Sequence, residues 1–339
     1  MPTVRIPNHR RLPAPARRRC QLTVVPARGV VLIDQAPPLA RFIDEAVIGL
    51  GATPKAMSPK WFYDALGSKL FDAICDLPEY YPTRTEMKLF ADHAPEMARR
   101  AGTGRVLIEL GSGNGEKVRR LMAHLRPRAY VGVDISKEVL HSATAKLKDE
   151  YPQLSVYAVC SDFSSGFRAP AELPAAARLY FYPGSSIGNF TPEQAVALLK
   201  PLARPGDALL IGVDLIKDRQ TLESAYDDAL GVTAAFNLNL LARMNRELRA
   251  DFDLSRFRHV ARFDEGLSRI EMHLESTTEQ SVCLDERKFS FAAGERLHTE
   301  SSYKYSVEGF AALAARAGWT LAQRWTDERR RFAELLFEA

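Results

Sequence analysis

The sequence predicts an α/β protein in which a doubly wound parallel sheet carries the ligand site and a smaller α+β lobe covers it. Three observations predict this class. Apolar runs of strand length alternate with amphipathic stretches between residues 106 and 214, a glycine-rich turn follows the first run, and acidic residues stand at the ends of later runs. Crossover connections make such strands parallel, so a ligand is expected at their carboxyl ends.

Each predicted strand is bounded by turn or helix-start signals. The fourth run leads into PGSSIGNF, after which Thr191, Pro192 and Gln194 form a capping box with proline at the first helical position. The five strands are predicted at Val106–Leu110, Tyr130–Ile135, Ser155–Cys160, Arg178–Tyr182 and Ala208–Val213.

Two segments flank this unit and do not share its pattern. Residues 31–100 are mostly helical in pattern, and residues 221–305 hold a helical stretch followed by alternating runs. Together they are expected to form the smaller lobe, with residues 101–220 and 306–339 forming the sheet domain. In the second segment a long helical stretch is predicted at Thr221–Asp251, and alternating strands are predicted near Ser268–Leu274, Gln280–Leu284 and Arg296–Tyr305.

The basic charge of the chain is concentrated in residues 1–30. The formal net charge is +4, but this segment contains seven arginines and no acidic residue, which leaves 39 basic against 42 acidic residues in the rest. A mildly acidic body disfavours nucleic-acid binding, which needs clustered positive charge. The segment is proline-rich and lacks apolar periodicity, so we expect a basic, disordered tail; an organelle presequence or a misassigned start codon are the alternatives.

Composition disfavours several other classes of protein. No window approaches 18 uninterrupted apolar residues, so no membrane span is expected. The four cysteines lie far apart without a C-x-x-C pair, and the seven histidines show no ligand spacing. We therefore expect a reduced, cytoplasmic, monomeric enzyme with neither a disulfide framework nor a metal site.

The glycine-rich turn and two strand ends together predict a nucleoside cofactor. Residues 111–115 have the spacing G-x-G-x-G rather than the G-x-G-x-x-G of dinucleotide binders, which favours S-adenosylmethionine over a pyrophosphate. Asp134 is placed to accept hydrogen bonds from two ribose hydroxyls. Asp162 offers an acceptor for an adenine amino group, and Phe163 offers an apolar ring face beside it.

Long motifs carry the most specific signal in this chain. They are PKWFYDALGSKLFDAICDLPEYYPTRTE at residues 59–86, ELGSGNGEK at 109–117, FYPGSSIGNF at 181–190, AYDDALGVTAAFNLNLLARMNRELRADF at 225–252 and HTESSYKYS at 298–306, with the shorter VDIS and SDF. In these motifs the chain resembles the histidine Nα-methyltransferases of ergothioneine biosynthesis, which form the betaine hercynine from histidine and three molecules of S-adenosylmethionine. The likeness covers about residues 55–335.

The resemblance implies a Rossmann-like class I methyltransferase domain with a second, smaller α+β substrate-binding lobe. It also implies which residues hold the methyl donor, with Lys117 pairing with the donor's carboxylate. The donor set implied by matching motif is Tyr63, Gly111, Lys117, Asp134, Asp162 and Phe163.

The resemblance further implies an acceptor site for the amino acid L-histidine. Asn189 and Tyr226 are implied to bind its carboxylate, and Gly184 and Tyr63 to lie near its amine. Between Tyr80 and its neighbour Tyr81 the motif alone does not choose. The imidazole is implied to lie among Tyr80, Met272, Glu300 and Ser302.

The chemistry of these residue types supports the implied roles. The amide of Asn189 and the hydroxyl of Tyr226 donate hydrogen bonds to a carboxylate without a net charge that would repel a sulfonium. Glu300 and Ser302 stand two apart in a strand-like run, so both face one side. Tyr63 is the implied catalytic residue; because an ordinary phenol is a poor base, water or a small deprotonated fraction of the substrate are the alternatives.

Two other interpretations stay open at this point. An enzyme of the same fold could methylate another amino acid or an alkaloid amine; Glu300 favours imidazole, because an apolar or small residue would suit an indole better. A noncatalytic nucleoside-binding or macromolecule-binding module would be favoured if the arginine tail bound RNA, although the acidic body speaks against it. The turn GNGEK departs from the more Ser/Thr-rich turn of many relatives without touching the acceptor residues.

Overall fold

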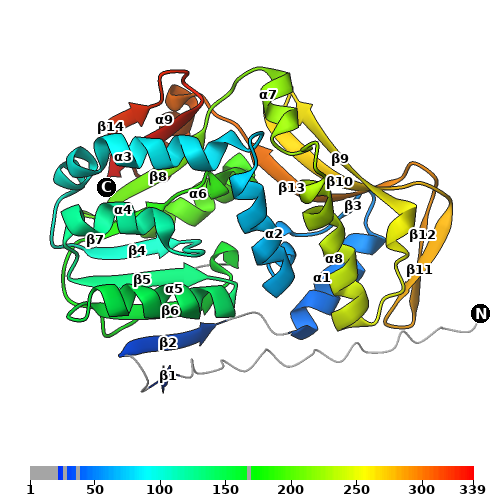
Figure 1. The fold of residues 1–339 in the computed structure, drawn as a ribbon, viewed down its shortest axis with the longest axis horizontal. Coiled ribbons are helices and arrows are strands. Elements are labelled where there is room, and N and C mark those ends of the chain that lie inside the picture. Colours follow the sequence, from blue (N-terminus) through cyan, green and yellow to red (C-terminus); the bar gives the residue numbers. More distant parts are fainter. Residues whose placement is uncertain (1–21, 26–28, 36–38, 166–168) are drawn as a thin grey trace, which may run out of the picture.

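A nine-stranded sheet forms the larger part of the molecule in the computed structural model, which describes residues 22–25, 29–35, 39–165 and 169–339 (Figure 1). Six strands, β2, β6, β5, β4, β7 and β8, are parallel, and the remaining three run antiparallel to their neighbours. From edge to edge the strands are β1 (Leu22–Val25), β2 (Val30–Gln35), β6 (Ser155–Ser161), β5 (Ala129–Asp134), β4 (Val106–Leu110), β7 (Arg178–Tyr182), β8 (Ala208–Asp214), β15 (Phe332–Glu338) and β14 (Thr320–Thr326).

The five predicted parallel strands are confirmed, and β4 and β7 have the predicted bounds. In space these strands follow the order β6-β5-β4-β7-β8. Successive strands are therefore added on one side of β4 as far as β6 and on the other side from β7 to β8, as in a Rossmann-like doubly wound fold. Nearly every residue of these strands is buried, because helices cover both faces of the sheet. The carboxyl ends of β4, β5 and β6 therefore meet at one edge, where the glycine-rich turn lies.

Five helices form the layers on the two faces of this sheet. One layer contains α3 (Tyr81–Ala101), α4 (Glu116–Leu125) and α5 (Lys137–Glu150), and the other contains α6 (Pro192–Leu199) and α9 (Val307–Arg316). The predicted capping box at α6 is confirmed: the Thr191 hydroxyl accepts from the Gln194 N–H at 3.2 Å, and the Gln194 side chain accepts from the Thr191 N–H at 2.9 Å.

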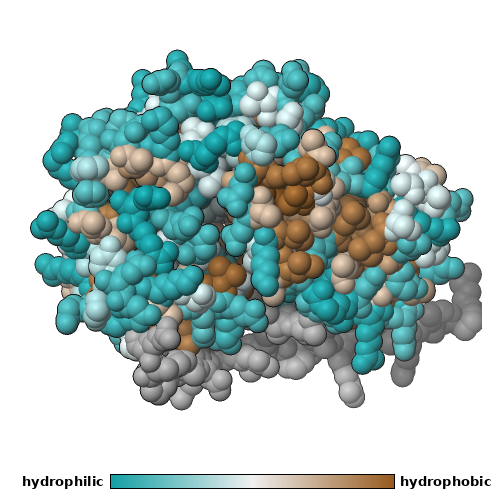
Figure 2. All heavy atoms as spheres, viewed as in Figure 1, coloured by the Kyte–Doolittle hydropathy of each residue, from teal (hydrophilic) through white to brown (hydrophobic). Residues whose placement is uncertain are grey.

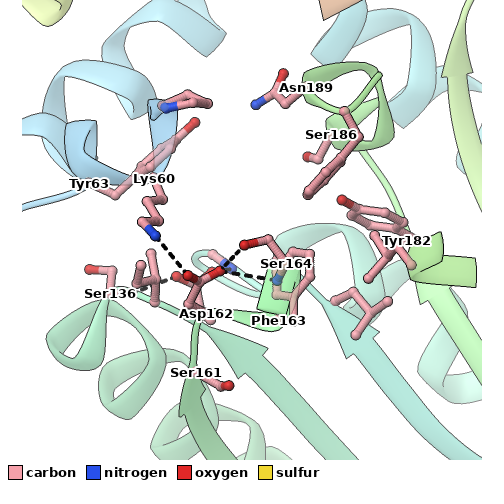
Figure 3. Close-up of a pocket in the computed structure, with 18 of the residues that line it drawn as sticks. Lys60, Tyr63, Ser136, Ser161, Asp162, Phe163, Ser164, Tyr182, Ser186 and Asn189 are labelled. Atoms are coloured by element: carbon pink, nitrogen blue, oxygen red, sulfur yellow. Dashed lines mark hydrogen bonds and ion pairs between the residues drawn. The ribbon is translucent and has the colours of Figure 1, made fainter. Parts of the chain in front are cut away.

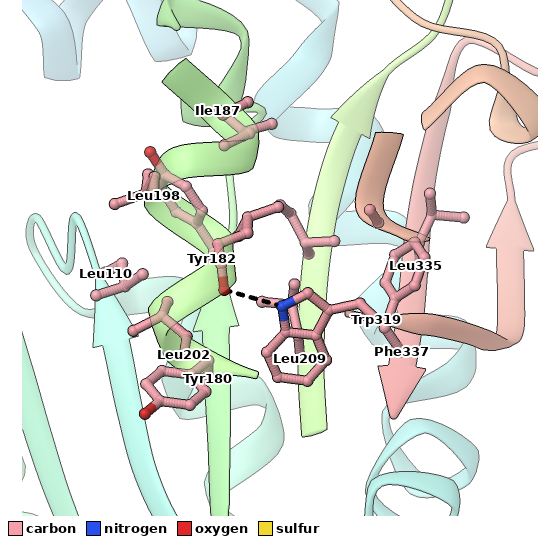
Figure 4. Close-up of a cluster of buried hydrophobic side chains, with 14 of the residues drawn as sticks. Leu110, Tyr180, Tyr182, Ile187, Leu198, Leu202, Leu209, Trp319, Leu335 and Phe337 are labelled. Atoms are coloured by element: carbon pink, nitrogen blue, oxygen red, sulfur yellow. Dashed lines mark hydrogen bonds between the residues drawn. The ribbon is translucent and has the colours of Figure 1, made fainter. Parts of the chain in front are cut away.

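The core on the α6 and α9 face is rich in aromatic side chains (Figure 4). Trp319 is buried against Tyr180, with the ring centroids 6.4 Å apart in an edge-on arrangement. The Trp319 indole N–H donates to the carbonyl oxygen of Leu199 at 3.1 Å, which satisfies its polar atom inside the core. This packing joins the end of α6 to the antiparallel pair β14 and β15.

A second lobe is built around a separate four-stranded sheet. Its strands follow the order β3-β13-β10-β9, and a two-stranded hairpin, β11 and β12, extends from it. The bounds are β3 (Lys55–Ala56), β9 (Phe257–Asp264), β10 (Arg269–Ser276), β11 (Gln280–Leu284), β12 (Arg287–Phe291) and β13 (Arg296–Tyr303). The second lobe also contains the helices α1 (Leu39–Gly51), α2 (Ala65–Asp76), α7 (Arg219–Ser224) and α8 (Val232–Leu248). Short 3-10 helices occur in both parts of the molecule: η1 (Pro59–Phe62), η2 (Phe163–Ser165), η3 (Ser186–Asn189), η4 (Lys200–Leu202) and η5 (Leu254–Arg256).

The surfaces of the two parts differ in character. On the face drawn in Figure 2, hydrophobic side chains gather over the second lobe, whereas the helices of the nine-stranded sheet present mostly hydrophilic side chains. Large apolar side chains exposed on the second lobe include Ile48, Leu66 and Leu230. Within the described residues, no helix combines the length and the apolar character that a membrane crossing requires.

The structure corrects the predicted boundaries at the amino-terminal end. β2 pairs with β6 from Val30 to Gln35, and α3 packs on β8 and β15. Both elements were predicted in the second lobe, but β2 is a strand of the nine-stranded sheet and α3 covers that sheet. Leu22–Val25, predicted as part of a disordered tail, form β1 against β2. Residues 1–21 and 26–28 of that tail lie outside the described residues. Local pattern identifies a strand or helix, but it does not say which sheet buries it.

The long helical stretch predicted at Thr221–Asp251 is divided in the structure into the two helices α7 and α8. Between α7 and α8 the carboxylate of Asp228 accepts hydrogen bonds from the N–H groups of Val232 and Thr233 at 2.9 and 2.7 Å. Gly231 adopts a φ of 73°, in the left-handed region that favours glycine. This turn brings Tyr226 out of the helical register and toward β13.

Candidate active site

The turn between β4 and α4 borders open space with its backbone. Gly111 and Gly113 have φ values of 67° and 48°, and a Cβ atom at either position would meet no protein atom within 4 Å. The Gly111 N–H donates to the carbonyl oxygen of Val133 at 2.8 Å, which ties the turn to the end of β5. A ligand can therefore approach the main chain closely here.

Asp134, at the end of β5, is held by backbone donors. Its Oδ2 accepts from the Gly113 N–H at 2.9 Å and its Oδ1 accepts from the Ser136 N–H at 2.8 Å. Burial raises the pKa of Asp134 above its ordinary value, although these hydrogen bonds oppose the change. Each carboxylate oxygen has a second lone pair, so Asp134 can also accept from a ligand hydroxyl.

Asp162, at the end of β6, is bound by a lysine from the second lobe (Figure 3). The ammonium of Lys60 donates to Asp162 Oδ2 at 2.9 Å, and the Ser164 N–H donates to Oδ1 at 3.1 Å. Burial alone would raise the pKa of Asp162, but the hydrogen bonds from Ser164 and Lys60 hold it below its usual range. Phe163 contacts Tyr182 edge-on, with the ring centroids 5.8 Å apart. Sequence reasoning did not foresee the contribution of Lys60.

A cavity of about 750 Å³ joins these strand ends to the second lobe. It is lined by the glycine-rich turn, the ends of β5 and β6, η1 and α6, and Figure 3 shows several of these side chains pointing into it. The size and the mixture of carboxylates, backbone donors and ring faces suit S-adenosylmethionine. The predicted residues that line it are Tyr63, Gly111, Asp134, Asp162, Phe163 and Asn189.

Lys117 and Gly184, which come from α4 and the loop after β7, meet at one buried carboxylate. The Lys117 ammonium lies 2.6 Å from Glu86 Oε2, and the Gly184 N–H donates to Glu86 Oε1 at 2.6 Å. Gly184 has a φ of 78°, and a Cβ there would lie 2.9 Å from the Lys117 nitrogen. The residue predicted for the donor carboxylate and the residue predicted for the acceptor amine are thus neighbours.

The other predicted acceptor residues form a cluster in the second lobe. The Tyr226 hydroxyl donates to Ser302 Oγ at 2.8 Å, and the rings of Tyr80 and Tyr226 are 6.1 Å apart. Met272 of β10 is the cross-strand partner of Glu300 in β13. These predicted acceptor residues are far apart in the sequence, but they lie together in the structure and none of them is exposed.

η3 brings Asn189 from the sheet domain to this cluster. A Cβ at Gly188 would lie 2.9 Å from the carbonyl oxygen of Tyr303 and 3.3 Å from Ser302 Oγ, so glycine permits a close approach of η3 to β13. The acceptor cluster and the donor cavity consequently adjoin at Asn189.

The neighbouring tyrosines Tyr80 and Tyr81 face different partners. The Tyr81 hydroxyl lies 2.8 Å from both carboxylate oxygens of Asp214 and accepts from the Lys217 ammonium at 2.6 Å. Tyr80 instead packs against Phe71 and Tyr226. Tyr80 is therefore the member of the pair that borders the acceptor cluster.

Lys304 is a buried residue of the site that sequence reasoning missed. Its ammonium donates to the Tyr226 hydroxyl and to Ser302 Oγ, both at 2.9 Å, and lies 2.8 Å from Asp214 Oδ2. Burial would lower the pKa of Lys304, but Asp214 and Tyr226 hold it above its ordinary value. The alternation of β13 carried a signal, since Lys304 stands two residues after Ser302 on the same face.

Comparison with known proteins assigns the family. The model of the histidine-specific, S-adenosylmethionine-dependent methyltransferases matches residues 42–339. The chain belongs to this family. The histidine N-alpha-methyltransferase of Mycolicibacterium smegmatis is 47% identical over 290 residues, which cover 82% of this chain and 89% of that protein.

More distant proteins are similar to this methyltransferase as well. The ergothioneine biosynthesis protein 1 of Neurospora crassa is 30% identical over 286 residues, which cover 80% of this chain and 32% of that protein. A solved S-adenosylmethionine-dependent methyltransferase from Clostridium acetobutylicum is 13% identical, with a TM-score of 0.45 over 80% of this chain and 96% of that one.

Glu300 of this methyltransferase is a buried carboxyl group without a close partner. It is 8% exposed, and no hydrogen bond reaches its carboxylate from the residues that the structure describes. Burial raises the pKa of Glu300 to about 7, and only the charge of Lys304 opposes this. A carboxyl group held in this way favours a ligand that donates a hydrogen bond.

Tyr63 of the methyltransferase lies between the donor cavity and the acceptor cluster. Burial raises its pKa well above the ordinary value, and the charges of Glu300 and Asp134 raise it further. The phenol therefore stays protonated at neutral pH and can donate or accept a hydrogen bond. Among the described side chains of His, Cys, Asp and Glu, no group of three or more is arranged to hold a metal ion.

Proposed function

We propose that this enzyme transfers three methyl groups to the α-amine of L-histidine and so forms hercynine, the first step of ergothioneine biosynthesis. The observation that carries the proposal is the buried Glu300 carboxyl beside Met272, which an imidazole N–H would satisfy. The names of the relatives, histidine N-alpha-methyltransferase and ergothioneine biosynthesis protein 1, support the same substrate.

On this proposal, the chain's own residues orient the methyl donor in the cavity. S-adenosylmethionine supplies a methyl group on a positively charged sulfonium, which becomes neutral on transfer. Asp134 accepts from the ribose hydroxyls, and Lys117 pairs with the donor's carboxylate. Asp162 accepts from the adenine amino group while it keeps the Lys60 contact, since a carboxylate has several lone pairs.

The acceptor's carboxylate and ring are held at separate places. Asn189 and Tyr226 donate to the carboxylate. The Tyr226 hydroxyl donates to Ser302 Oγ at 2.8 Å in the described structure, so on this proposal it turns its proton from Ser302 to the carboxylate, while the Lys304 ammonium still donates to the Tyr226 oxygen. Glu300 and Ser302 hold the imidazole edge from the same face of β13.

The proton on the amine must leave before the nitrogen can attack. Tyr63 does not take this proton, because its pKa is raised well above the ordinary value by burial. Its hydroxyl oxygen instead accepts a hydrogen bond from the amine and turns the lone pair toward the methyl group, and water or the deprotonated fraction of the substrate removes the proton.

Aromatic rings near Tyr63 favour the later methylation steps. The rings of Tyr63 and Phe71 are 5.7 Å apart, and those of Phe71 and Tyr80 are 6.3 Å apart. The faces of aromatic rings attract a methylated ammonium, because its positive charge is only weakly hydrated. These rings therefore retain the mono- and dimethylated intermediates for a further methylation cycle.

Mass spectrometry of the products tests the proposal. Histidine and its α-N-methyl and α-N,N-dimethyl forms should all yield hercynine with S-adenosylmethionine, whereas other amino acids should react poorly.

E300A should lower kcat/KM for histidine by about 100-fold and reduce the penalty against tryptophan. N189A should impair every amino acid alike, because the carboxylate is common to all. A better rate with another amino acid or an alkaloid amine would overturn the choice of histidine.

A further inference from the structure

Two carboxyl groups from distant parts of the chain are buried together beside Lys117. Glu86 of α3 and Glu334 of β15 are both 0% exposed. They converge over Gly212, the cross-strand partner of Glu334 in β8, where a Cβ would collide with Glu86 Oε1 and lie 2.9 Å from Glu334 Oε1. The space that admits both carboxyl groups exists because Gly212 has no side chain.

The surroundings of this pair contain too little positive charge for two carboxylates. Lys117 is the cation that faces them, and its ammonium contacts Glu86. No hydrogen-bond donor among the described residues reaches either oxygen of Glu334; Glu86 is its neighbour, and Lys117 acts on it through its charge. Two carboxylates cannot donate to each other unless one of them carries a proton.

We propose that Glu334 is a protonated positioning residue, which donates a hydrogen bond to Glu86 and thereby sets the Glu86 carboxylate that holds Lys117 and the Gly184 N–H. Glu86 accepts from Gly184 at 2.6 Å through the oxygen that does not contact Lys117. One buried carboxylate thus fixes a residue of the donor site and a residue of the acceptor site. The inference rests on the proposed function, in which Lys117 pairs with the donor's carboxylate.

The electrostatics agree with this assignment. Burial raises the pKa of Glu334 well above 4.5, Glu86 raises it further, and Lys117 opposes the change. The neighbours of Glu334 on the adjacent strands, Gly212 and Trp325, carry no charge.

Other titratable groups near the pair are already accounted for. Cys75 faces Lys117, and burial raises the pKa of that thiol, so it stays neutral. Asp214, two residues beyond Gly212, is paired with Lys304 and Lys217. A thiol and a carboxyl group carry no positive charge, and the two lysines are committed to Asp214, so none of these groups stabilises a second ionised carboxylate.

A shared proton has a functional consequence at Lys117. By drawing charge away from Glu86, the Glu334 proton weakens the grip of Glu86 on the Lys117 ammonium and leaves it able to bind a second carboxylate. Without that proton, the ion pair competes with the donor. The expected effect of losing Glu334 is therefore weaker binding of S-adenosylmethionine.

Three variants of the full chain test the proposal. E334Q keeps a donor toward Glu86, whereas E334L removes it. L335A is the matched control, because Leu335 lies in the same strand with its side chain in the core on the opposite face. For each variant, calorimetry gives the Kd for S-adenosylmethionine and assays give kcat and KM. E334L should raise this Kd about tenfold or more, E334Q should restore it to within about threefold of the wild type, and L335A should lower Tm while leaving the Kd unchanged.

The pH dependence of folding tests the proton itself. The wild-type Glu334 keeps a proton that the unfolded chain releases above about pH 4.5, so the wild type loses stability as pH rises. Glutamine has no such proton, and the folding equilibrium constant of E334Q relative to the wild type should rise by up to tenfold per pH unit above that value. This measurement stands even if E334L fails to fold.

The outcomes separate the inference from the proposed function. A Kd for E334L equal to that of the wild type, or a stability difference between E334Q and the wild type that is constant with pH, overturns the role of Glu334. A wild-type protein that binds S-adenosylmethionine but does not methylate histidine overturns the proposed substrate and leaves the Glu334 test intact.

Discussion

Replacing Glu300 by glutamine tests the central feature of the acceptor site. The substitution keeps the shape of the side chain and removes its ability to ionise. In the folded protein burial raises the pKa of Glu300 from 4.5 to about 7. Between these values the unfolded chain has released the proton that the folded protein still holds, so the wild type loses stability as pH rises through this window.

The size of the effect follows from the width of that window. At about 1.4 kcal/mol for each pH unit, the ionisation of Glu300 costs the wild type about 3 kcal/mol by pH 8. E300Q carries no such cost. The difference in unfolding free energy between E300Q and the wild type should therefore shift by about 3 kcal/mol in favour of the variant between pH 4 and pH 8.

Denaturant unfolding without ligands, repeated at intervals from pH 4 to pH 8, measures this difference. The comparison with the wild type cancels every titrating group that the two proteins share. E308Q is the control, because it makes the same chemical change at an exposed glutamate. Its unfolding free energy relative to the wild type should depend far less on pH. A difference between E300Q and the wild type that does not change with pH would refute the buried, poorly paired state of Glu300.

Three further predictions concern the donor site, the buried lysine and the first strands. D134A should weaken S-adenosylmethionine binding by about 2 to 4 kcal/mol in calorimetry, because buried ribose hydroxyls lose a charged acceptor; an unchanged Kd would remove Asp134 from the site. K304M should destabilise the fold by about 3 to 5 kcal/mol, since it leaves the buried Asp214 with one cation fewer, and should raise KM for histidine more than the Kd for the donor. A chain that begins at Gly29 should keep its activity. A chain that begins after Gln35 lacks β2 and should lose about 3 to 5 kcal/mol of stability in thermal unfolding, because two buried side chains of β2 are deleted. Equal Tm values for the two chains would show that β2 contributes little.

The sequence by itself determined the elements that depend on neighbouring residues. The strands from β4 to β8, the capping box of α6 and the glycine-rich turn were predictable because period, cap and turn chemistry act within a few residues. The types of residue at the strand ends indicated a nucleoside, and the long motifs indicated the family that the comparison confirmed.

Only the tertiary structure decided which distant residues share the site. Lys60 reaches Asp162 over 102 residues of sequence, Lys304 meets Asp214, and Glu334 meets Glu86, yet each of these residues is of a type that usually faces solvent. The same holds for β2, whose pattern does not show that it extends the nine-stranded sheet. For these side chains the fold supplies a partner of opposite charge or a shared proton that offsets the cost of burial, and no local pattern in the sequence records which residue that partner is.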